Sequence, residues 1–276
     1  MADLDQEQRT LVAYFENLGR CIIAFSGGVD SAVVAKAAFL ALGENALAVT
    51  ADSPSLARAE LEEASQVASL IGIPHRIVAT NELAREEYVR NAADRCYHCK
   101  TELYDHLEQI ARDEGVATLV NGANTDDLGD YRPGMQAAAE FRVVSPLIEC
   151  GYDKQNVRQL ADRWQLPIWD KPASPCLASR IAYGEEVSPD RLAMIEDAER
   201  FLKERGFRNV RVRYHRGDLA RVELPADELE RLCEPSLREA LNKHFTDLGF
   251  KFITLDLQGF RSGSLNALVP LQLPGQ

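Results

Sequence analysis

A glycine-containing segment near the N-terminus has the composition of a site that binds phosphate groups. Residues 26–31 read Ser-Gly-Gly-Val-Asp-Ser and directly follow an apolar run at 21–25. Adjacent glycines allow backbone angles that turn successive N–H groups toward one point, and a helix beginning there aims its positive end at the same place. A tight glycine turn with Ser31 capping the helix is the structural alternative. The segment therefore predicts an anion site formed by Ser26, Gly27, Gly28, Asp30 and Ser31.

This loop differs from the Walker A sequence in one informative way. Walker A ends in Gly-Lys-Ser/Thr, whereas no lysine is present at 26–31. The lysine reaches the β- and γ-phosphates in Walker A proteins, so its absence argues against simple cleavage of the γ-phosphate.

Polar residues also follow two later strands of the expected sheet. Thr50 and Asp52 end one apolar run, and the segment 121–127 brings Gly122, Asp126 and Asp127 after another. Ligands of doubly wound sheets bind outside the carboxyl ends of the strands, so we expect these loops beside the phosphate loop. The two neighbouring carboxylates are suitable ligands for Mg²⁺ on a phosphate group, and a solvated turn is the alternative.

Three cysteines stand where thiolates could bind a metal. Cys96 and Cys99 lie in the segment Cys-Tyr-His-Cys-Lys, which we expect to be a polar loop opening a helix, and Cys176 lies in a connector. A single Cys-x-x-Cys can be a redox pair, half of a zinc site or part of an iron–sulfur ligand set. Three thiolates would leave one iron of a 4Fe-4S cluster open to hydrosulfide, and zinc held together with His98 is the alternative metal. The remaining cysteines are expected to be buried apolar residues: Cys21, Cys150 and Cys233.

The elements that must position these residues alternate over the first part of the chain. Expected strands lie at 21–25, 46–50, 75–79, 118–121, 143–145 and around Ile168, and expected helices lie at 6–18, 31–42, 57–71, 100–114 and 154–164. This alternation predicts an α/β fold with a doubly wound parallel sheet, which we assign to a first domain at 1–170.

The pattern changes in the second part, which we assign to a smaller α+β domain at 171–276. A connector at 171–187 precedes a helix with Ser188 as N-cap and Pro189 at its first position. Strands are expected at 209–215, 219–224 and 251–257, with helical stretches between 226 and 247. Alternation in the first of these strands puts Arg211 and Arg213 on one face, where paired arginines can bind a phosphate or carboxylate; a solvated sheet face is the alternative.

Glu199 falls within the apolar stripe of the helix that begins after Ser188. A carboxylate in that position needs a partner or a metal. We expect an arginine from the adjacent sheet to supply the partner, and a catalytic role for Glu199 is the alternative.

Composition excludes some partners. The 276-residue chain is 46% hydrophobic and carries a net charge of -12, which disfavours an extended nucleic-acid partner. The chain contains no apolar run of membrane-spanning length, and its first residues are acidic where a signal peptide is basic. These features predict a cytoplasmic protein without a membrane partner and with reduced cysteines.

The phosphate loop resembles the PP-loop of the N-type ATP pyrophosphatases, which split ATP between the α- and β-phosphates to adenylate a substrate. Nearly the whole chain is similar to the LarE family of sulfur transferases, on five segments: 26–31, 129–134 (Gly-Asp-Tyr-Arg-Pro-Gly), 179–184 (Ser-Arg-Ile-Ala-Tyr-Gly), 210–213 (Val-Arg-Val-Arg) and 259–263 (Gly-Phe-Arg-Ser-Gly). The resemblance implies ATP and Mg²⁺ as cofactors and the synthesis of the nickel-pincer nucleotide of lactate racemase. In that reaction a carboxylate of a pyridinium dicarboxylate mononucleotide is adenylated and sulfur then displaces AMP.

The resemblance also implies residue roles and partners. Thr50 and Asp52 stand where the family contacts adenosine. Asp30 and Lys100 are implied to be catalytic. The substrate phosphate is implied to bind Ser179, Arg180, Arg211 and Arg213. A homo-oligomer, a hexamer, is implied, with sulfide or a sulfur-donor protein as the source of sulfur.

The sequence departs from the family members that sacrifice a cysteine to dehydroalanine. Pro175 stands at the sacrificial position, Cys176 falls one position later, and Cys96 and Cys99 have no counterpart there. This pattern is similar to the members in which three cysteines hold a 4Fe-4S cluster with an extra sulfide. It predicts such a cluster on Cys96, Cys99 and Cys176.

Three other functions fit parts of this pattern. A tRNA thiolase would use the same loop, but the acidic charge and the lack of a basic appended domain argue against it. An ammonia-dependent ligase or NAD synthetase would adenylate without needing thiolates. A nucleotide-binding regulatory protein would need no intact set of Asp30, Ser31, Asp126 and Asp127.

Overall fold

The computed structural model describes residues 2–129 and 133–261 and divides the chain into two compact units. Unit 1 comprises Met1–Glu82 and Cys96–Ser174, and unit 2 comprises Leu83–Arg95 and Pro175–Gln276. The chain therefore passes between the units at 82/83, 95/96 and 174/175. The second unit includes a short segment from the middle of the chain.

Unit 1 contains a parallel four-stranded sheet in the order β3-β2-β1-β4. Its strands are β1 (Cys21–Ala24), β2 (Ala46–Asp52), β3 (His75–Ala79) and β4 (Thr118–Val120). Its helices are α1 (Ala2–Leu18), α2 (Val29–Leu42), α3 (Arg58–Ile71), α5 (Arg95–Glu114), α6 (Pro133–Glu140), α7 (Pro146–Glu149) and α8 (Lys154–Arg163). The expected doubly wound α/β fold is confirmed.

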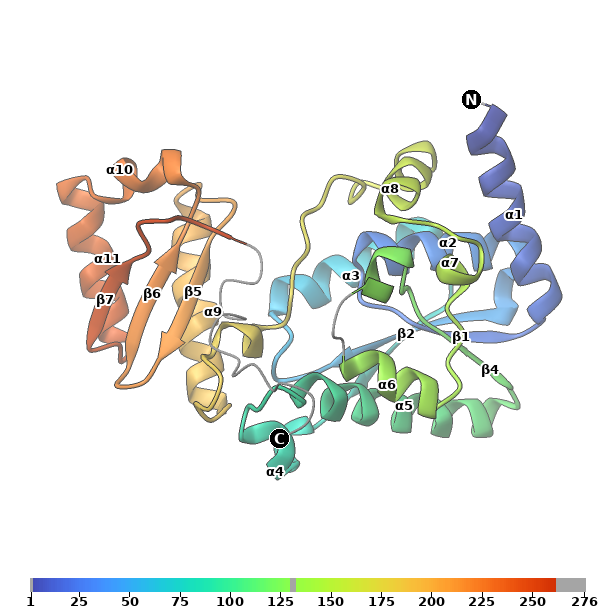
Figure 1. Cartoon of the computed structure of the whole chain (residues 1–276), viewed down its shortest axis with the longest axis horizontal. Coiled ribbons are helices and arrows are strands. Elements are labelled where there is room, and N and C mark those ends of the chain that lie inside the picture. The colour runs from blue at the N-terminus through green and yellow to red at the C-terminus, as the bar shows by residue number, and fades with distance from the viewer. Residues whose placement is uncertain (1, 130–132, 262–276) are drawn as a thin grey trace. The chain divides into compact units, whose positions relative to one another are not determined.

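The central strand β1 distributes its side chains between two cores. Cys21 and Ile23 join α1, α2, α3 and α8 on one face, whereas Ile22 joins α5 and α6 on the other. This alternation follows from the two-residue period of a strand and explains why the whole run is apolar (Figure 1). Both faces of β1 are therefore covered, and ligands can approach only at the strand ends.

Two expected strands of this unit are absent from the described residues. Residues 143–145 form only an isolated bridge between Val144 and Val120, and the region around Ile168 is a turn. Within the described ranges, no helix combines the length and apolar character that a membrane span requires.

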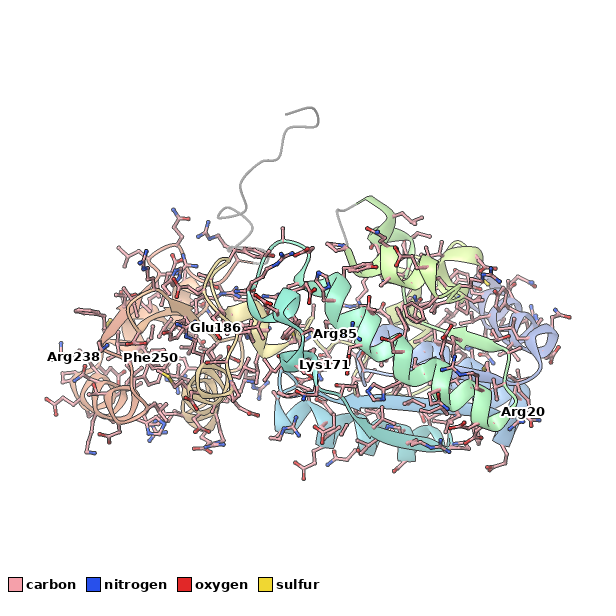
Figure 2. All side chains as sticks on the ribbon, turned by 90° about the horizontal axis from the view of Figure 1, so that it is seen from below. Arg20, Arg85, Lys171, Glu186, Arg238 and Phe250 are labelled. Atoms are coloured by element: carbon pink, nitrogen blue, oxygen red, sulfur yellow. The ribbon has the colours of Figure 1, made fainter. Side chains whose placement is uncertain are left out.

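Unit 2 is built on a mixed three-stranded sheet in the order β5-β6-β7. Antiparallel β5 (Arg211–His215) and β6 (Leu219–Glu223) are joined by parallel β7 (Phe252–Leu255). The helices are α4 (Glu86–Val89), α9 (Pro189–Glu204), α10 (Leu229–Leu232) and α11 (Pro235–Asp247). Ser188 caps α9 as expected, with its hydroxyl accepting from Arg191 N, and Pro189 is at the first helical position. Phe250 is buried in this unit, whereas Arg238 on α11 extends into solvent (Figure 2).

Candidate functional site

The loop at 25–28 joins β1 to α2 and is held by its own serine side chains. Ser31 Oγ accepts from Ser26 N at 3.2 Å and donates to Gly28 O at 3.0 Å. The two serine hydroxyls lie 3.1 Å apart, and Ser26 Oγ also accepts from Gly28 N at 3.3 Å. The side chains thus fix the curvature of the loop at the positive end of α2, where an anion is favoured.

Two glycines allow neighbouring backbone to approach this loop. Gly27 has φ +73°, and a Cβ atom there would lie 2.7 Å from the Cα and Cβ atoms of Ala64 in α3. A Cβ on Gly122, which follows β4, would lie 2.8 Å from Ser31 N. Only glycine fits at either position, so the ends of β1 and β4 and the start of α2 meet closely.

Asp30 is the centre of a polar cluster at this edge of the sheet. Its Oδ1 accepts from Asn124 Nδ2 at 3.0 Å, and its Oδ2 lies 2.5 Å from Lys154 Nζ at the start of α8. Asp127 accepts from the backbone N–H of Asn124 at 3.0 Å, and Asp126 accepts from that of Lys154 at 3.3 Å. Asn124 and Lys154 thus connect Asp127 and Asp126 to Asp30 in the first turn of α2.

Asn124 and Lys154 are site residues that sequence reasoning missed. Asn124 lies in the loop 121–127, and its position two residues before Asp126 is a signal in the sequence. Lys154 follows the N-cap Asp153, 124 residues after Asp30, and no spacing rule connects the two. Only the packing of α8 on α2 brings the lysine to the loop.

Thr50 is buried beneath the loop. Its hydroxyl donates to Phe25 O at 2.8 Å and lies 2.8 Å from His75 Nε2, so the histidine nitrogen carries the proton of the second bond. Burial lowers the pKa of His75 below its ordinary value of 6.5. Asp52, at the end of β2, is paired with Arg58 at 2.6 Å. The Thr50 side chain thus binds the backbone at the start of the loop, whereas Asp52 lies at the end of β2.

Cys96 and Cys99 lie in the first turns of α5, which begins at Arg95. The expected polar loop is therefore wrong, because helical structure already includes the cysteines. Three-residue spacing puts both thiols on one helix face; Cys96 is exposed and Cys99 half-buried, and neither forms a disulfide. Lys100 is on the same helix, and a Cβ on Gly134 would lie 3.0 Å from its Cγ, so α6 begins against this turn.

Other cysteine expectations have mixed outcomes. Cys21 is buried as expected, Cys150 is half-buried, and Cys233 is exposed, so the expectation for Cys233 is wrong. Within the described residues, no group of three or more His, Cys, Asp or Glu side chains is arranged to hold a metal. Cys176 belongs to unit 2 and the Cys96–Cys99 pair to unit 1.

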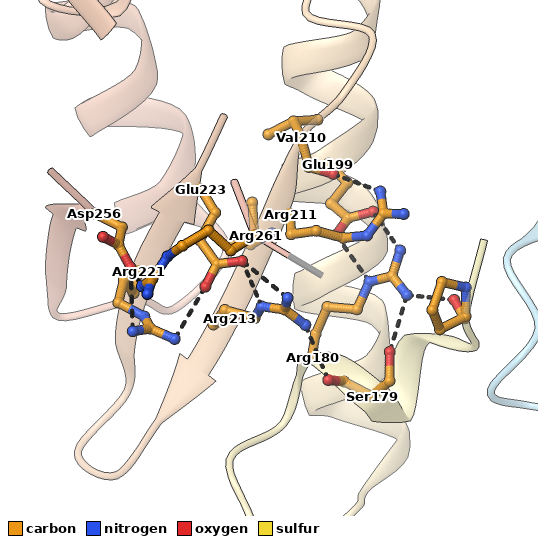
Figure 3. A network of polar contacts seen from close by, with 12 residues as sticks. Ser179, Arg180, Glu199, Val210, Arg211, Arg213, Arg221, Glu223, Asp256 and Arg261 are labelled. Carbon is orange, nitrogen blue, oxygen red and sulfur yellow. Dashed lines mark hydrogen bonds and ion pairs between the residues drawn. The ribbon is translucent and has the colours of Figure 1, made fainter. Parts of the chain in front are cut away.

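Cys176 is half-buried and immediately precedes the short 3₁₀ helix Leu177–Arg180. The buried Arg180 donates through Nε and Nη2 to Glu199 at 3.0 and 3.3 Å (Figure 3). Glu199 also accepts from Val212 N at 3.1 Å. The expected arginine partner of Glu199 is present, but it comes from the connector rather than from the sheet.

A chain of opposite charges continues from β5 across the sheet of unit 2 (Figure 3). Arg213 pairs with the fully buried Glu223 at 2.8 Å and donates to Ser179 O at 3.1 Å. Arg221 lies between Glu223 and Asp256, at 3.0 and 3.2 Å. These contacts bring Arg213 to the backbone of Ser179.

Arg211 completes the group of arginines on β5. It is largely buried, donates to Val210 O at 2.8 Å and lies over the ring of Phe260, with 5.4 Å between guanidinium and ring centre. The segments 130–132 and 262–263 of the resembling motifs are outside the described residues.

A parallel α/β sheet whose first strand leads through Ser-Gly-Gly-x-Asp-Ser into a helix defines a nucleotide-binding protein of the PP-loop class. A family model described as NAD synthase matches residues 9–105, which include this loop.

Curated relatives match far more of the chain. An uncharacterized protein of Synechocystis is 46% identical over 96% of this chain and 99% of its own length. Pyridinium-3,5-bisthiocarboxylic acid mononucleotide synthase of Lactiplantibacillus plantarum is 37% identical over 96% of each chain. A tRNA-specific 2-thiouridylase of Azorhizobium caulinodans is 30% identical over 56% of this chain and 49% of its own. The chain belongs to the LarE family of ATP-dependent sulfur transferases.

Proposed function

We propose that this protein uses ATP to adenylate a carboxylate of a pyridinium dicarboxylate mononucleotide and then replaces AMP with sulfur. The observation that carries the proposal is the loop between β1 and α2, with Asp30 and its neighbours at the positive end of a helix. The family relationship supplies the substrate class. The product, a thiocarboxylate, would serve the synthesis of the nickel-pincer nucleotide.

In the first step, a carboxylate oxygen of the substrate attacks the α-phosphorus of ATP, the bond to the β-phosphate oxygen breaks, and pyrophosphate leaves. The phosphates would bind at the positive end of α2, with Ser26 and Ser31 holding the loop. Asp126 and Asp127 would hold the Mg²⁺ that neutralises the charge of the leaving group. Lys154 and Lys100 would add positive charge, since groups aimed at developing charge contribute most to such steps.

The nucleotide base and ribose would lie at the ends of β2 and β4, beside Thr50, Asp52 and Gly122. Thr50 would act mainly through its backbone, because its hydroxyl already bonds Phe25. The phosphate of the substrate mononucleotide would bind Ser179, Arg211 and Arg213, with Arg180 supporting them from its buried position.

In the second step, a sulfur nucleophile attacks the activated carbonyl carbon, the bond to AMP breaks, and a thiocarboxylate forms. We propose Cys96, Cys99 and Cys176 as ligands of a 4Fe-4S cluster. Thiolates are the ligands of iron–sulfur clusters, and none of the three cysteines is in a disulfide. Such a cluster would supply sulfide from its iron that lacks a protein ligand.

The substrate would be a small mononucleotide rather than tRNA, because the chain is strongly acidic. A gel shift with bulk tRNA at moderate salt should therefore show no complex. We also propose that the protein is cytoplasmic and forms a homo-oligomer, the hexamer implied by the resemblance. Sedimentation of the purified protein would test the hexamer.

The proposed function is tested with protein purified without oxygen. Pyrophosphate release that depends on ATP and on the mononucleotide would support adenylation. Iron, zinc and acid-labile sulfide are measured in the wild type and in Cys96→Ala, Cys99→Ala and Cys176→Ala, with iron and sulfide expected to fall in each variant. If the protein contains no iron and loses no cysteine during turnover, the sulfur step is wrong. The absence of pyrophosphate release would refute adenylation itself.

A further inference from the structure

The backbone around Cys176 is held by a buried arginine from its own connector. Arg180 Nη1 donates to the carbonyl oxygens of Pro175 and Cys176, the latter at 3.0 Å, while the rest of its guanidinium binds Glu199 (Figure 3). The N–H of Ser179 also donates to Cys176 O, at 2.9 Å. Because Glu199 holds the plane of the Arg180 guanidinium, the carbonyl groups of Pro175 and Cys176 that Arg180 binds have little freedom to move.

A second buried arginine reaches the same turn from a distant part of the sequence. Arg95, only 5% exposed, donates from Nη1 to Ala178 O at 2.9 Å and to Asn91 Oδ1. Arg95 lies in the Leu83–Arg95 segment of unit 2, and its contact with Ala178 spans 83 positions of sequence. The turn that carries Cys176 is thus bound by guanidinium groups at 175, 176 and 178.

Asn91 fixes the position from which Arg95 acts. It is fully buried with φ 55°, and its Nδ2 donates to the carbonyl oxygens of Ala182 and Glu185, both at 2.9 Å. Gly184 N donates in return to Asn91 O at 3.1 Å. These bonds align the segment before α5 with the connector over several residues, and Arg95 binds the side chain that forms two of them.

We propose that Arg95 and Arg180 are positioning residues that hold the Cys176 thiol for sulfur transfer. The assignment rests on the proposed function. With its backbone carbonyls bound, Cys176 can move its sulfur mainly by rotation about χ1. Arg95 also directly precedes Cys96 in the sequence. It therefore binds the turn of one proposed thiolate ligand, Cys176, and is the sequence neighbour of a second, Cys96. Small displacements of a reacting group reduce rates strongly, which gives the two arginines a role without contact to the reacting atoms.

The test measures alkylation of individual cysteines by iodoacetamide in the full chain, purified without oxygen and treated with an iron chelator so that bound iron does not protect the thiols, using peptide mass spectrometry. Cys233 serves as the exposed reference within unit 2, and the fully buried Cys21 reports unfolding of unit 1. In Arg95→Ala, Cys176 should react about tenfold faster than in the wild type, because a bond from a charged donor is lost. Cys233 should react at its original rate, and Cys21 should stay protected.

Two further variants separate positioning from general damage. Arg95→Lys retains a charged donor and should give an intermediate Cys176 rate. Arg90→Ala removes an exposed pair with Asp94, at 2.8 Å in the same segment, and should leave the Cys176 rate unchanged. If Arg95→Ala exposes Cys21, Arg95→Lys decides: a raised Cys176 rate supports the proposal, and a wild-type rate overturns it.

Two activity measurements distinguish this proposal from the proposed function. In Arg95→Ala, pyrophosphate release should stay within about twofold of wild type while thiocarboxylate formation falls about tenfold. Equal thiocarboxylate formation in variant and wild type, with Cys176 equally reactive, overturns the positioning role alone. A wild-type protein that forms no thiocarboxylate overturns the proposed function and this assignment with it.

Discussion

Lys154 Nζ lies 2.5 Å from Asp30 Oδ2, although the two residues are 124 positions apart. The lysine begins α8, and the aspartate lies in the first turn of α2. The other oxygen of Asp30 is bound by Asn124. Asp30 thus has a cation on one oxygen and an amide donor on the other, at the loop where the nucleotide phosphates are proposed to bind.

Replacing Lys154 with methionine should slow pyrophosphate release by about 10²-fold, the usual loss when one group that stabilises developing charge is removed. Release of pyrophosphate at saturating ATP measures the effect. Lys243→Met is the matched control, because Lys243 pairs with Asp247 on an exposed surface of unit 2. Equal rates for Lys154→Met and wild type would exclude a role for this lysine in the leaving-group step.

Gly27→Ala should weaken both ATP binding and folding. Gly19 and Gly27 share φ +73°, but a Cβ at Gly19 has no heavy atom within 4 Å, whereas one at Gly27 meets Ala64. Gly19→Ala should therefore cost only the backbone penalty of about 1–2 kcal/mol. Gly27→Ala should cost a further ~1–3 kcal/mol because α3 must shift. Urea unfolding and ATP titration of both variants measure the difference, and identical stabilities would contradict the close approach.

Glu199→Gln should destabilise the protein by about 3–5 kcal/mol, because it leaves the buried Arg180 charge without its partner. Chemical denaturation followed by fluorescence gives the free energy of unfolding. Glu204→Gln on the same helix is the control, since Glu204 is exposed and lies 3.9 Å from Arg200. A loss no larger than that of the control would mean that Arg180 finds compensation elsewhere.

Stability should decline as the pH falls below about 6.5, in part because of His75. Burial lowers the pKa of His75 in the folded state, so the unfolded chain takes up a proton first. The contribution of the neutral histidine is present above its unfolded pKa and is lost as the pH falls toward the folded value. His75→Gln should flatten the dependence of unfolding free energy on pH in this range. Part of the slope should remain, because burial also lowers the pKa of His215.

The sequence predicts the phosphate loop and its flanking elements well, because β1 is covered on both faces and two glycines mark its end. The strand at 75–79 is also predicted with its observed bounds. Errors occur where tertiary contacts override local pattern. The expected polar loop at Cys96 and Cys99 is wrong because α5 already begins at Arg95. The expected strand at 143–145 is wrong because this segment forms a single bridge, between Val144 and Val120.

The site is predictable where one strand leads directly to one loop, as for Ser26 to Ser31. The site is harder to predict where the interacting residues come from distant parts of the sequence. Lys154 reaches Asp30 through helix packing, and Arg180 reaches Glu199 from the connector. The apolar stripe indicates only that Glu199 needs a partner or a metal. Periodicity identifies the buried charge but not the segment that neutralises it.

The Leu83–Arg95 segment has a consequence for synthesis of the protein. It leaves the ribosome well before the connector that it binds, because Asn91 and Ile181 are separated by 90 positions. During that interval the nascent chain carries Asn91 without its acceptors in the connector and Arg95 without Ala178. Unit 2 can therefore be completed only after all of unit 1 has been translated, and a gene fragment beginning at 175 would encode a unit without one of its own parts.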